Sequence, residues 1–467
     1  MVRSERAVET LLSAALRLAW GFRVELGLIS AVWIGWDLAT SKLGPQLGPL
    51  FVVGVVVLIL ALSWTRHGLW RVLRFARVRR RFQGACRIAP LDREGRQVPM
   101  VYRIEDTPAG YRLFVRVSRG TAVADLERVA EVTAAAMAVS KVRVQRDRRN
   151  AALARVAVVK RDPLSDPRPL TWPWARAERT SLWDPVPVGL DEDGNTVSLS
   201  LPEHNVLLGG EPGAGKSAAL SLLLAAAALD PDVTLWLLDG KQVELAPWVS
   251  CAQAFVGPDV AQATEVLRSL QVEMDLRYAQ LLAWGKRKVA PGDGLGLHVV
   301  ACDELALYLA AGDRKERTEG AEVLRDLVAR GRAAGVIVLA ATQKPASDVV
   351  PTSLRDLFGF RWALRCATRE ASDTILGSGW ATQGYSAADV DAGARGVGYL
   401  LHEGGVPVRL KAAYLDDEAV AALAGPGSCA TRRETGDDHR PCRPQGPRPG
   451  SGQGRRPGGL RGLASPG

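Results

Sequence analysis

The stretch from Asn205 to Leu223, NVLLGGEPGAGKSAALSLL, decides the fold of this chain. It opens with an apolar run that predicts a buried strand and closes with an Ala/Leu-rich run that predicts a helix. Between them, GEPGAGKS fits the phosphate-loop pattern G-x-x-x-x-G-K-[ST] at every position. The glycines let backbone N–H groups turn inward around phosphates, and the next helix points its positive dipole end at them. The stretch therefore predicts a nucleoside triphosphate site formed by Gly210, Glu211, Pro212, Gly213, Ala214, Gly215, Lys216, Ser217 and Ala218.

Within this loop, two side chains have predicted roles. Lys216 would reach the β- and γ-phosphates, and Ser217 would ligate Mg²⁺. The alternative is a glycine-rich turn that binds nothing, which the strand before it and the helix after it disfavour.

Strands and helices alternate from about residue 188 to residue 420. Apolar runs at 233–238, 297–302 and 336–341 predict further buried strands. This alternation is typical of an α/β fold with a mostly parallel sheet covered on both faces. We therefore predict a P-loop NTPase motor domain over residues 188–420.

The strand predicted at 297–302 is followed directly by two acids, Asp303 and Glu304. In a nucleotide-hydrolysing site, Asp303 would hold Mg²⁺ through water and Glu304 would polarise the attacking water. An apolar strand ending in two acids is common by itself, so the phosphate loop upstream is what favours the catalytic interpretation.

Other polar residues near strand ends are weaker candidates. Gln343 follows the strand at 336–341, where an amide can sense the γ-phosphate or simply form the exit into a loop. Arg332 and Arg365, and also Arg330 and Arg361, could each donate a positive charge to a nucleotide across a subunit boundary. An arginine finger of this kind can raise the rate of hydrolysis ~10³–10⁵-fold. The alternative for each residue is a surface ion pair.

Composition restricts the remaining possibilities. The six cysteines are scattered among 467 residues with no C-x-x-C pair, which argues against a zinc site or a disulfide scaffold and suits a reducing cytoplasm. The net charge of +10 is concentrated in two segments: seven arginines and no acid at 65–82, and eight arginines against three acids from Gly425 onward. The excess positive charge therefore lies beside the predicted membrane segment and in the tail, and it carries no information about the surface charge of the motor.

The N-terminal part predicts a membrane anchor. A short cytoplasmic helix (1–23) precedes two apolar runs, Leu26–Trp36 and Leu47–Trp64, separated by a Gly-Pro-punctuated loop. The second run is close to the ~20 residues that span a bilayer. Two spans over 24–65 would keep both arginine-rich flanks inside and leave only Lys42 in the outer loop, in line with the positive-inside tendency. We therefore expect a transmembrane hairpin in the plasma membrane with the motor on the cytoplasmic side; one span plus an interfacial helix is the alternative.

Three further segments complete the predicted organisation. Residues 66–85 form a basic juxtamembrane segment, and residues 86–165 a small α/β adaptor with strands near 111–117, 142–144 and 156–159 and a helix at 123–139. Prolines and tryptophans at 166–187 indicate a linker. The tail, 425–467, holds Gly, Pro, Arg and Ser with few apolar residues, and we expect it to be disordered.

Several stretches together resemble the FtsK/SpoIIIE family of DNA translocases. The resemblance covers roughly residues 200–415 and, beyond the phosphate loop, it rests on seven stretches in family order. They are Leu238-Asp-Gly-Lys241 with Glu244-Leu245, Glu273-Met-Asp-Leu-Arg-Tyr278, Asp303-Glu304, Ala329-Arg-Gly-Arg-Ala-Ala-Gly335, Ala341-Thr-Gln-Lys-Pro345, Asp373-Thr-Ile-Leu376 and Val406-Pro-Val-Arg409. The segment 86–165 resembles, more loosely, the adaptor that precedes the motor in that family.

The resemblance implies a RecA-like motor that hydrolyses ATP with Mg²⁺, is tethered to the membrane, assembles as a hexameric ring and threads double-stranded DNA through its channel. It also implies that Gln343 is a γ-phosphate sensor. For DNA contacts, the best candidates are Lys286, Arg287 and Lys288, followed by Arg314 and Lys315. A solvated loop is the alternative for these residues, and phosphate contacts of this kind would be salt-sensitive and indifferent to sequence.

Departures from the family pattern bear on the biological role. Chromosomal members carry four spans, a long linker and a C-terminal winged helix, whereas this chain offers a two-span hairpin, almost no linker and a polar tail. This layout is similar to the Tra-type transfer proteins of actinobacterial conjugative plasmids, which implies movement of plasmid DNA between cells. The alternatives are a chromosome-segregation translocase at the septum, a secretion-coupling ATPase that acts on polypeptides, and a scaffold that binds nucleotide without hydrolysing it; the intact Glu304 argues against the last.

Overall fold

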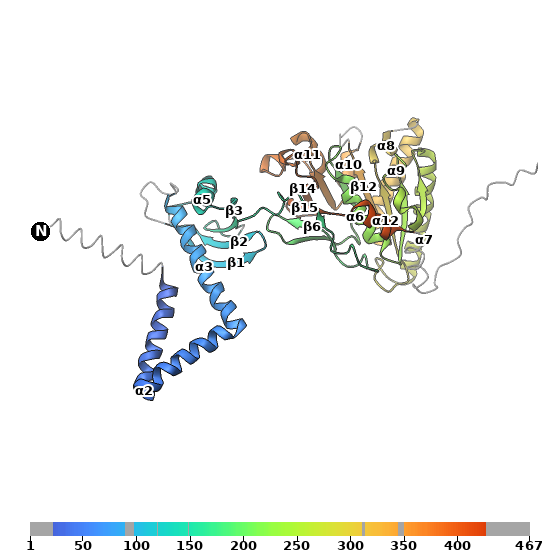
Figure 1. Cartoon of the computed structure of the whole chain (residues 1–467). Helices are drawn as coiled ribbons and strands as arrows, with labels where there is room; N and C mark the ends of the chain where they lie inside the picture. Colours follow the sequence, from blue (N-terminus) through green and yellow to red (C-terminus); the bar gives the residue numbers. More distant parts are fainter. Residues whose placement is uncertain are drawn as a thin grey trace, which may run out of the picture.

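The computed structural model describes residues 22–88, 98–118, 120–147, 149–310, 313–343 and 350–425. Two helices lead into a small sheet, and a larger sheet with its helices follows (Figure 1). The predicted N-terminal helix (1–23) lies outside the described residues except for its last two positions, and the predicted tail lies outside them except for Gly425.

Helix α2 (Arg23–Ala61) bends sharply at Gly44, whose backbone (φ 82°, ψ 167°) is not helical. Its two limbs form a V (Figure 1). Gly48 allows the limbs to approach closely, because a Cβ at this position would lie 2.6 Å from the Cα of Thr40. In the described part of the chain, this is the one helix that is long and apolar enough to cross a membrane, over Glu25–Val57, judged by length and composition alone.

Helix α3 (Ser63–Ile88) contains the basic segment predicted to lie beside the membrane. It continues without interruption past residue 86, where we predicted the adaptor to begin. Val78 and Phe82 on its apolar side are buried in the same core as Leu113 and Val156 of the small sheet. The second half of the basic helix is thus part of the unit that we predicted as an adaptor, and we keep this name for it below.

The adaptor is an antiparallel sheet in the order β1-β2-β4-β3, covered by α3, α4 and α5. Its elements are β1 (Met100–Thr107), β2 (Gly110–Arg116), α4 (Val123–Arg128), α5 (Ala130–Met137), β3 (Lys141–Arg146) and β4 (Leu153–Val159). Strand β1 was not predicted, because its register shifts between Val101 and Arg103 and this irregularity breaks the apolar alternation. The single helix predicted at 123–139 is two short helices, which separate at Val129 (φ −97°, ψ 9°).

The motor is built on a mixed sheet that counts eleven strands among the described residues, in the order β10-β9-β11-β12-β8-β13-β14-β15-β6-β7, with β5 paired to β15. The strands are β5 (Leu170–Thr171), β6 (Val186–Asp191), β7 (Thr196–Leu199), β8 (Val206–Gly209), β9 (Val233–Leu238), β10 (Ala252–Val256), β11 (Leu297–Cys302), β12 (Val336–Thr342), β13 (Phe360–Leu364), β14 (Val397–His402) and β15 (Val408–Tyr414). The six strands from β10 to β13 in this order are parallel, and the pairs from β13 to β7 are antiparallel. The four buried strands predicted from apolar runs correspond to β8, β9, β11 and β12.

Helices cover both faces of this sheet, and the motor therefore has two hydrophobic cores, one on each face. In β8, Val206 and Leu208 belong to one core and Leu207 belongs to the other, because successive side chains point to opposite faces. The first core contains α6 (Lys216–Ala228) and α12 (Asp417–Ala424) with η1 (Ala246–Cys251); the second contains α7 (Val260–Ala283), α8 (Leu305–Ala310) and α9 (Arg314–Arg330). The remaining helices are η2 (Gly331–Ala334), α10 (Thr352–Arg355), α11 (Arg369–Leu376), η3 (Ala381–Gln383) and η4 (Ala387–Asp389).

The segment predicted as a linker, 166–187, packs onto the motor. Trp172 and Leu182 are buried in the core that contains α6, and the Trp172 Nε1–H donates to the carbonyl of Pro187 at 2.8 Å. The motor core therefore begins before residue 188, the boundary that we predicted.

Candidate functional site

The phosphate loop connects the end of β8 to the start of α6, as the sequence predicted. Gly213 (φ 76°) and Gly215 (φ 104°) have left-handed backbones that residues with a Cβ rarely adopt. A Cβ on Gly215 would also lie 3.2 Å from the backbone of Gly396, which precedes β14. Glycine is thus required at Gly215 both for its backbone conformation and for its close packing.

Lys216 is the first residue of α6 and is buried. Its ammonium group donates to the carbonyls of Gly210 at 2.8 Å and Glu211 at 2.9 Å. Burial lowers the pKa of Lys216, and the carboxylate of Glu304 opposes this shift. Because the loop itself supplies these two acceptors, the charge is held at the loop without a direct carboxylate partner in the part of the chain described, which suits exchange for a phosphate oxygen.

Asp303 follows β11 and is 7% exposed. Its Oδ1 accepts the N–H of Gly240 at 2.8 Å, whereas its buried Oδ2 has no hydrogen-bond partner among the described residues. Burial, and to a lesser extent Asp239 and Glu304, raises the pKa of Asp303 to about 6. An unpartnered buried carboxylate oxygen that lines the same cavity as the phosphate loop could accept a hydrogen bond from a water molecule bound to Mg²⁺.

Glu304 connects the ends of β11 and β12. Its carboxylate accepts the hydroxyl of Thr342 at 2.8 Å and the backbone N–H of Gln343 at 3.1 Å. The strand order puts β12 between β11 and β8, so the acids and the phosphate loop lie on strands separated by a single strand. The candidate base and the candidate sensor are thus in direct contact.

Two residues to which the sequence gave no role complete this side of the site. Glu244 forms an ion pair with Lys241 at 2.9 Å. Burial alone would raise the pKa of Glu244, but hydrogen bonds from Lys241 and Ser217 bring it below its ordinary value. An acceptor for the hydroxyl of Ser217 is therefore present before a metal arrives.

One cavity of about 870 Å³ brings most of these predicted residues together. Its first wall consists of the phosphate loop, α6, the two strand ends and the segment after β9, with Pro212, Gly213, Gly215, Lys216, Ser217, Ala218, Lys241, Glu244, Asp303 and Gln343. The sequence did not predict the second wall, which includes residues from 162–170, 391–396 and 409–414. The first of these segments lies more than two hundred residues before the other two, so no local pattern could assign them to one site.

The candidate arginines are not gathered at this cavity. Arg365 pairs with Glu211 of the phosphate loop at 2.7 Å within the same chain. Arg332 pairs with Glu403 at 3.1 Å and lines a separate cavity of about 570 Å³. Arg330 pairs with Asp326 on α9, and Arg361 lies 3.5 Å from Asp356.

The candidate DNA contacts lie in the turn after α7. Lys286 pairs with Asp293 and lies over the ring of Trp284, and Lys288 pairs with Glu203. Arg287 is exposed and has no ion pair within the described residues. Of the two weaker candidates, only the backbone is described for Arg314, and Lys315 is exposed on α9.

Comparison with known proteins agrees with this geometry. Residues 174–300 match the model of the FtsK/SpoIIIE family. The chain is 29% identical over 255 residues to a DNA translocase FtsK of Chlorobaculum tepidum and 29% identical over 251 residues to the DNA translocase SftA of Bacillus subtilis. These alignments cover 49% and 50% of this chain but only 31% and 25% of the relatives, so the chain spans less than a third of their length.

Among solved structures, the monomer form of the pCW3 conjugation coupling protein TcpA is similar in fold. The match has a TM-score of 0.52 and 17% identity, and it covers 75% of this chain and 99% of TcpA.

Proposed function

We propose that this chain, which carries an FtsK/SpoIIIE family domain, is a membrane-anchored ATPase that moves double-stranded DNA and serves in conjugative transfer of plasmid DNA. The observation that carries the proposal is the cavity in which Lys216, Asp303 and Gln343 meet. The order β9-β11-β12-β8-β13 supports a RecA-like motor around it.

Each predicted residue has a role that its surroundings support. Lys216, held at 2.8 Å from the loop carbonyl of Gly210, would exchange this contact for the β- and γ-phosphates. Ser217 and Asp303 would hold Mg²⁺, which neutralises phosphate charge when it is bound. Glu304 would take the proton of the attacking water, and Gln343, whose N–H donates to that carboxylate, would sense the γ-phosphate.

The relatives, which are named DNA translocases, support double-stranded DNA as the substrate. A ring, most simply a hexamer, would place a neighbour's arginine at the nucleotide. Arg332 suits this trans role, because it lies outside the cavity of its own chain, whereas Arg365 already binds its own phosphate loop through Glu211. In the channel, Arg287 is the strongest candidate for a phosphate contact, because Lys286 and Lys288 are paired with acids.

The membrane anchor is supported by the surface of α2. Trp33, Ile34 and Leu50 are each at least two-thirds exposed, which is costly in water and favourable in a bilayer. Both limbs of the V would span the membrane, with the arginines of α3 at the cytoplasmic leaflet. The plasmid-transfer role is supported by a fold shared with the conjugation coupling protein TcpA along 99% of that protein's length.

The test is the ATPase rate of the full chain in detergent, with and without long duplex DNA of unrelated sequences, beside a Lys216→Ala variant. We expect DNA to stimulate hydrolysis strongly and the variant to abolish it. Hydrolysis that is indifferent to DNA would refute the DNA substrate and favour a motor that acts on polypeptides.

A further inference from the structure

The second wall of the cavity begins in the segment that leaves the adaptor. Strand β4 ends at Val159, and Asp162, Leu164, Ser165, Asp166, Pro167, Pro169 and Leu170 all line the cavity. We call residues 162–170 the strap. The strap therefore lines the same cavity as the phosphate-loop residues Lys216 and Ser217 and as Asp303.

The strap is fixed to the motor along its length. Leu164 is buried with Val390 and Val397, on either side of the 391–396 segment. The ammonium group of Lys411 donates to the carbonyls of Asp166 and Arg168, the latter at 2.9 Å. At its end, β5 pairs with β15. A segment with this many motor contacts is part of the site, although it directly follows the last strand of the adaptor.

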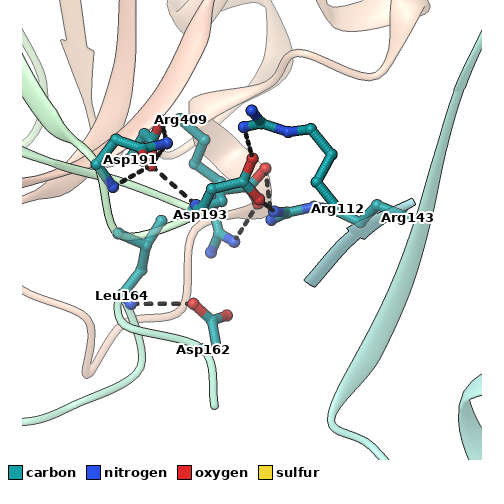
Figure 2. Close-up of polar contacts among 9 residues, drawn as sticks. Arg112, Arg143, Asp162, Leu164, Asp191, Asp193 and Arg409 are labelled. Carbon is teal, nitrogen blue, oxygen red and sulfur yellow. Dashed lines mark hydrogen bonds and ion pairs between the residues drawn. The ribbon is translucent and has the colours of Figure 1, made fainter. Parts of the chain in front are cut away.

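Ion pairs from Arg112 and Arg143 attach the adaptor to the motor, and we call these contacts the clamp. The turn between β6 and β7 presents Asp193, which accepts Arg112 of β2 at 2.6 Å and Arg143 of β3 at 2.6 Å (Figure 2). Asp191 shapes this turn by accepting the backbone N–H groups of Asp193 at 2.9 Å and Asn195 at 2.8 Å. The turn also meets the β1–β2 turn, where the Ala109 N–H donates to the Asp193 carbonyl at 3.0 Å.

One carboxylate connects this clamp to the cavity. Glu192 accepts Arg143 of the adaptor at 2.8 Å and Arg409 of β15 at 3.2 Å, and Arg409 lines the cavity. All three side chains are only 21–26% exposed, so solvent screens these pairs less than it screens surface pairs.

We propose that the strap and Arg409 form the nucleoside half of the nucleotide site, and that docking of the adaptor through Arg112 and Arg143 sets the nucleotide affinity of the motor. This inference rests on nucleotide binding as proposed above. When the clamp is closed, it fixes the start of the strap at Asp162 and orients Arg409 through Glu192. By linkage, a bound nucleotide stabilises the docked adaptor to the same extent. Docking of the adaptor thereby couples the nucleotide state of the motor to the N-terminal helices that precede the adaptor.

The test measures ADP affinity by titration calorimetry on the full chain in detergent. The double variant Arg112→Ala/Arg143→Ala should bind ADP about 5- to 20-fold more weakly, the lower range of typical coupling between sites. The Arg112→Lys/Arg143→Lys variant, which keeps both charges, should recover most of the affinity. Arg116→Ala, an exposed arginine on the same strand β2, is the matched control and should bind as the unmodified chain does.

A second readout separates coupling from a general loss of structure. ADP should slow tryptic cleavage after Arg161, which directly precedes the strap, in the unmodified chain, and this protection should be lost in the double alanine variant. Unchanged ADP affinity in the double variant, or an equal loss in Arg116→Ala, would overturn the inference. If ADP binds and the clamp variants weaken it, but duplex DNA leaves hydrolysis unchanged, the inference stands and the proposed DNA substrate fails.

Discussion

Replacing Asp303 with Asn should stabilise the protein in the absence of nucleotide and Mg²⁺. Burial raises the pKa of Asp303 from its ordinary 3.8 to about 6, because the folded protein holds a buried carboxylate that the unfolded chain leaves in water. That difference corresponds to at most ~3 kcal/mol of unfolding free energy above pH 6. An Asn still accepts the N–H of Gly240, but its own amide N–H lacks a partner, which costs ~1–2 kcal/mol. We expect a net stabilisation of ~1–2 kcal/mol at pH 8.

The sign of the pH dependence makes this expectation specific. A raised carboxyl pKa penalises the folded state only while the group is ionised, so the advantage of Asn should shrink as the pH falls from about 6 to about 4. Urea unfolding of the full chain can be followed by tryptophan fluorescence, since Trp172, Trp248 and Trp362 are fully buried in the motor. The midpoint should move upward by roughly 0.5 M at pH 8.

A neighbouring acid provides the control. Asp239 is fully buried, and its two oxygens accept the backbone N–H groups of Gln242 at 2.9 Å and Leu245 at 2.8 Å. Asp239→Asn should therefore destabilise the protein, because an amide cannot accept through both of its polar atoms. If Asp303→Asn is no more stable than the unmodified chain at pH 8, or if its gain is the same at pH 4.5, burial of the ionised carboxylate is not what raises this pKa.

Three further predictions concern the site and the DNA contact. Glu304→Gln should slow ATP hydrolysis by ~10²–10⁴-fold, because an amide cannot take the proton of water, while ADP affinity in calorimetry stays near that of the unmodified chain; full activity would remove Glu304 as the base. Gly215→Ala should destabilise the fold by ~1–3 kcal/mol in urea unfolding and weaken ADP binding at least about tenfold, because alanine is strained at φ 104° and its Cβ presses on Gly396; unaltered ADP affinity would contradict the loop geometry. Arg287→Ala should lower the slope of log K against log[salt] for duplex DNA by ~0.9 without changing DNA-free hydrolysis, and an unchanged slope would assign Arg287 to a solvated loop.

The parts of the structure that the sequence predicted are those fixed by local chemistry. The phosphate loop, its strand and its helix are contiguous, so pattern and context together defined them. The acids at 303 and 304 were found because they end an apolar run, and parallel strands bring such ends to one edge of a sheet. Strand β1 was not predicted, because its register shift near Val101 interrupts the alternation of apolar and polar residues by which a strand is recognised.

The second wall of the cavity could not be predicted, because its contacts join segments more than two hundred residues apart. Asp166 meets Lys411, and Glu192 meets Arg409, with nothing in either local sequence to name the partner. The pairing of β15 with β5 goes with the first of these contacts and the pairing of β15 with β6 with the second, and both pairings depend on the packing of the whole motor.

The segment at 166–187 shows why its composition was misleading. Prolines exclude helix and leave the chain extended, which is common to flexible linkers and to straps that lie along a sheet. The tryptophans distinguish the two cases, because a free linker gains nothing from a large apolar side chain, whereas Trp172 is 1% exposed in the motor core. Since β5 of this segment pairs with β15 and only two residues separate the strap from β4, the adaptor and the cavity share one continuous stretch of chain. We therefore expect nucleotide binding at this cavity to depend on the adaptor.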